Sequence, residues 1–113
     1  MSRSRGASRS LAASAPVFAA LGDETRLRLV SRLCHGGPAS IAKLTEGADV
    51  TRQAIAKHLR VLEDAGLVRG TREGRESVWE LEPRRLEDAR ECLETISAEW
   101  DGALARLKAF VER

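Results

Sequence analysis

The chain has 113 residues, with 19 Lys or Arg against 17 Asp or Glu and a net charge of +2. This length suits one domain and leaves no room for a second. A net charge this small excludes any argument for nucleic-acid binding from bulk charge, so the local distribution of charge has to decide. No apolar run approaches the ~20 residues that cross a bilayer, and no signal peptide is evident, so we expect a cytoplasmic protein that does not enter a membrane.

The first residues contain mainly Ser, Arg and Gly and offer little to bury. We therefore expect residues 1–13 to form a disordered basic tail and residues 14–113 to form the folded domain. The arginines of this tail either add solubility or reach into a DNA groove as an arm, and the sequence leaves both readings open.

A short first helix is predicted from Ser14 to Leu21, with Pro16 in its first turn and Gly22 at its end. Its apolar face comprises Val17, Phe18 and Leu21.

Asp23 is expected to cap a second helix from Glu24 to about His35, which ends before a Gly-Gly-Pro sequence. Arg26 falls within the apolar arc of this helix, and we favour a structural arginine over a phosphate contact. The arc comprises Leu27, Leu29, Val30, Leu33 and Cys34.

A third helix, capped by Ser40, is predicted from Ile41 to about Glu46. Gly47 to Asp49 then turn the chain, and Asp49 is a residue type that tolerates left-handed geometry.

The fourth predicted helix begins after Thr51, whose hydroxyl can cap it. Ile55, Leu59 and Leu62 follow at spacings of four and three, so they share one face. From Val50 to Arg60 the chain has cations and no acid, which reinforces the positive N-terminal end of the helix. This pattern favours contacts with phosphates and guanine edges.

Gly66 is expected to end this helix, and a β-hairpin of residues 67–72 and 75–81 follows, turning at Glu73-Gly74. Arginines cluster near its tip. A cationic helix followed by such a hairpin is typical of a winged helix-turn-helix, in which the helix enters the major groove and the hairpin reaches the flanking backbone.

Pro83 opens a last helix that reaches about Val111, roughly 40 Å if unbroken. Apolar residues recur along it at steps of three and four, and so small a domain cannot cover the whole stripe. A partner chain is the simplest solution.

The segment TRQAIAKHLRVLEDAGLV, the REGRE hairpin and the upstream FAALGDETRLRLVSRL resemble the ArsR/SmtB family of bacterial winged-helix repressors, over roughly Pro16 to Glu112. The resemblance implies a mainly α fold with a small β-hairpin, homodimeric through the first and last helices. It also implies a repressor of a palindromic double-stranded DNA operator, released by an unidentified signal. The predicted dimer interface is Val17, Phe18, Leu21, Leu93, Ile96, Trp100, Leu104, Leu107 and Val111.

The predicted DNA contacts lie on the fourth helix and on the hairpin. We assign the start of the helix to bases or nearby phosphates, Ala56 to a thymine methyl group and Arg60 to phosphate. His58 is expected to make a structural hydrogen bond. Arg69 is a weaker candidate than Arg72 and Arg75, because the sequence also allows its side chain to face the domain. The full set is Thr51, Arg52, Gln53, Ala56, Lys57, Arg60, Arg69, Arg72 and Arg75.

Founding members of the family hold metals through paired cysteines in the third helix or ligands on the last one. Ser40 and Ala42 occupy the matching third-helix positions here, and the ending WDGALARLKAFVE resembles a non-metal-sensing subgroup, so we expect no metal and no cofactor. The alternative is a metal or redox sensor that uses Cys34, His35 and Cys92.

An enzyme is not expected, because the chain has no Gly-rich phosphate loop, no nucleophile elbow and no carboxylate pair of recognisable spacing. A protein-interaction module that has lost DNA binding is the remaining alternative.

Overall fold

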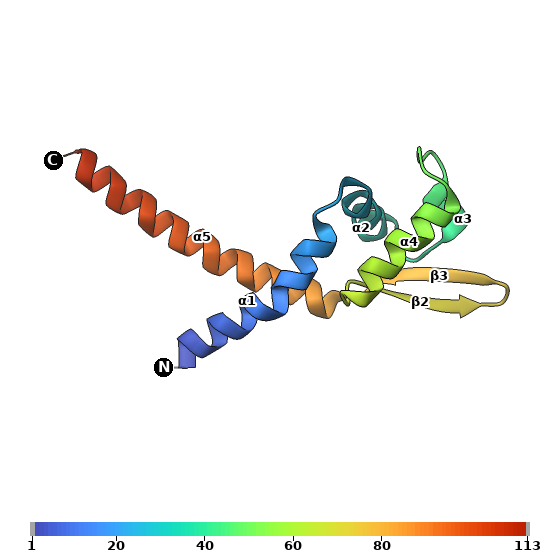
Figure 1. Cartoon of the computed structure of the whole chain (residues 1–113), viewed down its shortest axis with the longest axis horizontal. Helices are drawn as coiled ribbons and strands as arrows, with labels where there is room; N and C mark the ends of the chain where they lie inside the picture. Colours follow the sequence, from blue (N-terminus) through green and yellow to red (C-terminus); the bar gives the residue numbers. More distant parts are fainter. Residues whose placement is uncertain (1, 113) are drawn as a thin grey trace.

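The computed structural model describes the backbone of residues 2–112 and the side chains of residues 11–112. A small winged domain lies at one end, and two long helices cross beside it (Figure 1). The elements are α1 (Ser2–Leu21), α2 (Glu24–Gly36), β1 (Ala39–Ser40), α3 (Ile41–Thr45), α4 (Arg52–Asp64), β2 (Val68–Glu73), β3 (Glu76–Leu81) and α5 (Pro83–Val111). The mainly helical winged fold predicted from the sequence is thereby confirmed.

The core forms where α2, α4 and the sheet meet the C-terminal half of α1 and the first turns of α5. Leu59 and Leu62 of α4 and Leu67 after it are fully buried. This agrees with the apolar face predicted for the fourth helix. The other buried apolar residues are Val17, Ala20, Leu29, Val30, Leu33, Leu44, Ile55, Val68, Ala89 and Cys92.

Helix α1 is longer than predicted. It begins at Ser2 instead of near Ser14, so the prediction of disorder over residues 1–13 disagrees with the structure, and Pro16 lies inside the helix. Leu11, Ala12 and Ala13 are good helix formers and continue the helix across the predicted start at Ser14. Ser14 is buried mid-helix, where its hydroxyl donates to the Asp88 carbonyl of α5 (3.3 Å). The predicted groove-reaching arm falls on residues whose side chains lie outside the described part.

Helix α2 buries a narrower face than predicted. Leu27 is 52% exposed and Cys34 is exposed, so both lie outside the core in which the sequence placed them. The buried set is Leu29, Val30 and Leu33, which follows the 3.6-residue period more closely than the five-residue arc did. The Asp23 cap is confirmed by a bond from the Arg26 amide to the carboxylate (3.1 Å).

The helix caps and turns follow the local rules with one exception. Ser40 and Thr51 each accept a bond from the amide three residues on, as predicted. In the turn before α4, however, Gly47 has positive φ and no non-Gly residue of the described chain does. Asp49 therefore does not adopt the left-handed geometry allowed for it.

The sheet has three antiparallel strands in the order β1-β3-β2, whereas only the hairpin was predicted. The pairing of Glu73 with Glu76 leaves Gly74 and Arg75 as the turn, one residue later than expected. Gly74 takes the positive φ that such a turn demands. Strand β1 is two residues long and was missed because so short a strand has no sequence period.

Helix α5 projects beyond the winged domain as one unbroken helix (Figure 1). The molecule measures 65 × 32 × 20 Å with a radius of gyration of 18.2 Å, against about 13 Å for a compact domain of this length. Among the described residues, no helix is long and apolar enough to span a membrane.

Candidate DNA-binding surface

Helix α4 turns a polar face outward because its apolar face is fixed in the core. Ile55, Leu59 and Leu62 are buried, and the Thr51 hydroxyl accepts a bond from the Ala54 amide (3.1 Å), so the start and the rotation of the helix are both set. The face left outward carries a shallow hollow lined by Thr51, Gln53, Ala54, Ala56, Lys57 and Arg60. Five of these six residues were predicted as DNA contacts. Ala54, one helical turn from Lys57, is the sixth and was not among the predicted contacts.

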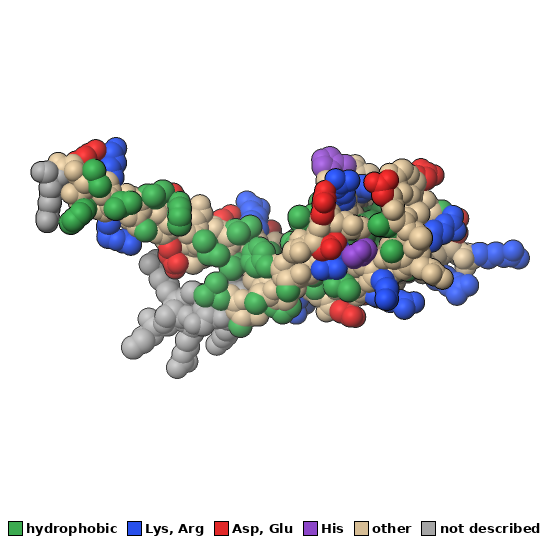
Figure 2. All heavy atoms as spheres, turned by 45° about the horizontal axis from the view of Figure 1, so that its top comes forward, with side chains coloured by type: hydrophobic (Ala, Val, Ile, Leu, Met, Phe, Trp, Pro, Cys, Tyr) green, Lys and Arg blue, Asp and Glu red, His purple; other side chains and the backbone are tan. Residues whose placement is uncertain are grey.

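The cations of this surface are exposed and uncommitted. Within the described part of the chain, no ion pair involves Arg52, Lys57, Arg60, Arg72 or Arg75. Figure 2 shows Lys and Arg side chains projecting at the end of the molecule where the wing lies. A partner that brings negative charge would therefore not have to break an existing ion pair.

The wing arginines divide between the two faces of the hairpin. The register places Arg72 on the same face as Val68 and Trp79, while Arg69 lies opposite Glu80 on the other face. Arg69 donates to Glu80 (2.6 Å) and lies 3.6 Å from Glu82. The Glu80 carboxylate, by this hydrogen bond and by its charge, raises the pKa of Arg69, with Glu82 adding to the effect. Arg69 is thus held by its own chain, unlike Arg72.

Glu63 ties the wing to α4, a contact that sequence reasoning missed. Its carboxylate accepts a bond from the Gly70 amide of β2 (3.0 Å). Strand β2 is an edge strand, so alternate amides point away from β3 and need another partner. A Glu near a helix end has no sequence signal that predicts this bond.

Arg26 and His58 join the first helices to the back of α4. The Arg26 guanidinium donates to the Ala20 carbonyl and to His58 Nδ1 (3.2 Å), and this nitrogen lies 3.9 Å from the Asp23 carboxylate. The structural roles predicted for Arg26 and His58 are confirmed, although the main acceptor of Arg26 is a carbonyl instead of a carboxylate. The bond from the Arg26 amide, together with nearby positive charge, lowers the pKa of Asp23.

The residues of the alternative sensor site lie in different surroundings. Cys34 is exposed on α2, whereas Cys92 is buried on α5. His35 Nδ1 contacts the Ser31 carbonyl (2.8 Å). Among the described residues, no group of three or more His, Cys, Asp or Glu is placed to hold a metal ion.

The predicted dimer residues divide into two groups. Val17 is fully buried within its own chain, and Phe18 and Leu21 are partly packed against the same core. Val17 is therefore a core residue here instead of an exposed interface residue. The predicted interface residues of α5 are all exposed. Phe110 of α5 and Leu11 of α1 are also exposed, although neither was predicted as an interface residue. The exposed α5 set is Leu93, Ile96, Trp100, Leu104, Leu107, Phe110 and Val111.

Comparisons with known proteins agree with this geometry. A helix-turn-helix domain family matches residues 21–71. The HTH-type transcriptional regulator Rv2034 of Mycobacterium tuberculosis is 38% identical over 82% of this chain and 83% of its own length. The Bacillus subtilis arsenical resistance operon repressor is 36% identical over 57% of this chain and 61% of its own.

The solved structure of an ArsR-like transcriptional regulator from Rhodococcus sp. RHA1 is 41% identical in sequence and has a TM-score of 0.70. The match covers 88% of this chain and 92% of that one. The match to this structure therefore extends beyond the helix-turn-helix segment of residues 21–71. The chain belongs to the ArsR family of winged helix-turn-helix regulators and is a DNA-binding transcriptional regulator.

Proposed function

We propose that the protein is a homodimeric repressor that binds a palindromic operator in the cytoplasm. The observation that carries the proposal is the set of exposed cations on α4 and the wing that have no ion-pair partner in the described chain. Phosphate contacts supply much of the affinity for DNA, and cations already paired within the protein would contribute less.

In this proposal α4 enters the major groove. Arg52, Gln53 and Lys57 contact base edges or nearby phosphates, and Ala56, which lines the hollow, meets a thymine methyl group. Thr51 caps the helix and places its first turn against the DNA backbone. Arg60 also binds a phosphate of that backbone.

Arg72 and Arg75 bind the backbone beside the groove. Arg69 contributes less, because its guanidinium is already paired with Glu80 and Glu82. Glu63 sets the position of the wing relative to α4 through the Gly70 amide.

The dimer follows from the uncovered stripe on α5. Figure 2 shows hydrophobic side chains along the projecting helix, and those of the predicted stripe from Leu93 to Val111 are exposed in the described chain. Pairing with a second copy would bury this stripe and relate two α4 helices by a twofold axis. Their half-sites would then lie about 34 Å apart, one turn of DNA.

Repression is proposed by analogy with the arsenical resistance operon repressor of Bacillus subtilis. A dimer bound across a promoter would exclude the polymerase. Release requires a signal that favours a dimer geometry unable to fit the operator.

The test begins with selection of a preferred site from random double-stranded DNA, followed by fluorescence polarisation against a scrambled site at two salt concentrations. We expect tight, selective and steeply salt-dependent binding with one dimer per palindrome. Lys57→Ala should weaken operator binding about tenfold, whereas Arg106→Ala on α5 serves as the matched control and should not.

Equal affinity for selected and scrambled sites would refute the operator-binding proposal and favour an interaction module. Selective binding by a monomer would refute the dimer and leave the DNA surface standing.

A further inference from the structure

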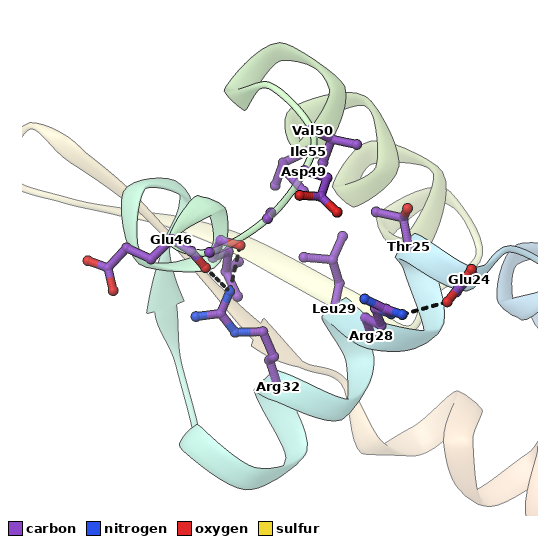
Figure 3. Close-up of a pocket in the computed structure, with 12 residues that line it drawn as sticks. Glu24, Thr25, Arg28, Leu29, Arg32, Glu46, Asp49, Val50 and Ile55 are labelled. Atoms are coloured by element: carbon purple, nitrogen blue, oxygen red, sulfur yellow. Dashed lines mark hydrogen bonds and ion pairs between the residues drawn. The ribbon is translucent and has the colours of Figure 1, made fainter.

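A cavity of about 430 Å³ opens between α2, α3 and the turn that leads into α4 (Figure 3). Its volume falls in the range typical of small-molecule sites. It lies apart from the hollow on the outer face of α4, with which it shares no lining residue.

The inner wall of the cavity is apolar. Leu29, Leu44 and Ile55 line it from three different helices and are almost fully buried, and the half-buried Val50 completes it. Such a wall favours a ligand with a hydrocarbon or aromatic body.

Both guanidinium groups at the cavity are already occupied. Arg28 pairs with Glu24 (2.6 Å), and Arg32 donates to the carbonyls of Leu44 (2.7 Å) and Lys43 (2.8 Å) at the end of α3. An anionic ligand would have to compete with these bonds. Both guanidinium groups are therefore held by the protein, although the carbonyls that bind Arg32 do not neutralise its charge.

Asp49 is solvent-exposed and carries a carboxylate that faces the cavity. Figure 3 shows its carboxylate turned toward Leu29, and no hydrogen bond or ion pair from this carboxylate is found within the described chain. The neighbouring Glu46 side chain points away from the cavity in the same view. One inward carboxylate over an apolar wall is complementary to a cation that carries an apolar group.

We propose that this cavity binds a small organic cation, an amine whose ammonium group pairs with Asp49 while its apolar body lies against the half-buried Val50 at the inner wall. A bare divalent metal is disfavoured, because a single carboxylate supplies too few ligands.

The site is placed to influence DNA binding. Asp49 is two residues before Thr51, the cap of α4, and Ile55 lies on α4 itself. An occupant that shifts this turn alters the first turn of α4, so the cavity is where the release signal acts. This regulatory role rests on the proposed repressor function, whereas the ligand site itself does not.

The test is a titration of the full-length, ¹⁵N-labelled protein without DNA, followed by NMR. Benzylammonium is the probe, and benzoate and benzyl alcohol are its anionic and neutral matches. We expect benzylammonium to shift the amides of Leu29, Asp49, Val50 and Ile55, with an affinity at least threefold above that of either match.

Asp49→Asn keeps the shape of the side chain and removes its charge, so benzylammonium binding should weaken about three- to fivefold, as expected for one exposed ion pair. Glu46→Gln removes an equal charge that faces away and should leave binding unchanged. Equal affinity for the three probes, equal effects of the two substitutions, or shifts elsewhere would overturn the site.

Operator affinity is then measured with saturating benzylammonium at constant ionic strength. We expect a change of at least threefold in the wild type and a smaller one in Asp49→Asn. Selective amine binding without any change in operator affinity would overturn the regulatory role alone. Because the titration contains no DNA, failure of the ligand site is distinguishable from failure of the repressor proposal.

Discussion

The winged domain buries most of its large apolar side chains, whereas the projecting half of α5 leaves its own exposed. In the winged domain Leu59, Leu62 and Leu67 are fully buried by their own chain. On α5, Trp100 is 65% exposed and Leu107 58% exposed, although they share one face of their helix as Leu59 and Leu62 do on α4. Periodicity therefore identifies an apolar face but does not say whether the same chain or a partner covers it.

Removing apolar side chains from the exposed stripe of α5 should have the largest effect. Trp100→Ala with Leu104→Ala should raise the dimer dissociation constant about 1,000-fold, because each truncation acts twice in a symmetric interface. Sedimentation velocity over a dilution series measures it. Arg106→Ala, off the stripe on the same helix, should leave the dimer intact. A double mutant that remains dimeric at every dilution would rule out this interface.

Truncating a side chain in the winged domain should instead reduce the stability of the fold. Leu59→Ala should lower the free energy of unfolding by about 3 kcal/mol through lost burial and the cavity left behind. Val61→Ala, 41% exposed on the same helix, should cost under about 1 kcal/mol. Urea unfolding at one fixed protein concentration measures both. Equal losses would contradict the burial described for α4.

Removing a cation from the outer face of α4 should affect DNA binding and neither fold nor dimer. Arg52→Ala should weaken operator affinity about tenfold and flatten its dependence on salt. Fluorescence polarisation at several salt concentrations measures both effects. Arg69→Ala is the informative comparison, since that guanidinium is already paired, and we expect less than about a threefold loss. The reverse order would reject the assignment of these two residues.

The bond from the Gly70 amide to Glu63 allows a test of whether the position of the wing relative to α4 affects DNA binding. Glu63→Ala removes the acceptor for the Gly70 amide and should weaken operator binding about threefold by loosening the wing, since a hydrogen bond contributes on the order of 1 kcal/mol. Asp64→Ala removes the same charge one residue later and controls for electrostatics. If both substitutions tighten binding equally, charge and not wing position determines the effect.

Replacing Asp23 should have the smallest effect, a small change in how the stability of the winged domain depends on pH. The pKa of its carboxyl is lowered below 3.8, first by the bond from the Arg26 amide. Its stabilising contribution is therefore complete above that ordinary value and is lost as pH falls through the lower folded value. Asp23→Asn keeps a capping oxygen but does not titrate, so wild type should lose slightly more stability than the variant on acidification. Thermal melts across this acidic range measure the difference, and parallel curves would contradict it.

Much of this fold could be predicted because local chemistry specifies it. The caps at Asp23, Ser40 and Thr51 and the apolar face of α4 depend on residues within one or two turns. The hairpin was also predicted, but its turn was placed one residue early, because Glu73-Gly74 and Gly74-Arg75 both offer a glycine to a tight turn.

The remaining features depended on contacts between segments distant in sequence. Strand β1 exists only because Ala39 and Ser40 pair with β3, and Glu63 reaches the wing only because β2 is an edge strand. Likewise, Val17 was expected at the dimer interface, but it is fully buried within its own chain.

The sequence by itself determined the order of the elements, the start of α4 and the cationic character of its outer face, because these follow from spacing, capping and charge. Only the tertiary structure decided which cations are free and which are paired, which apolar residues remain uncovered, and that Asp49 faces a cavity. The physical reason is that burial and ion pairing each depend on two surfaces that meet, whereas a sequence pattern describes only one of those surfaces.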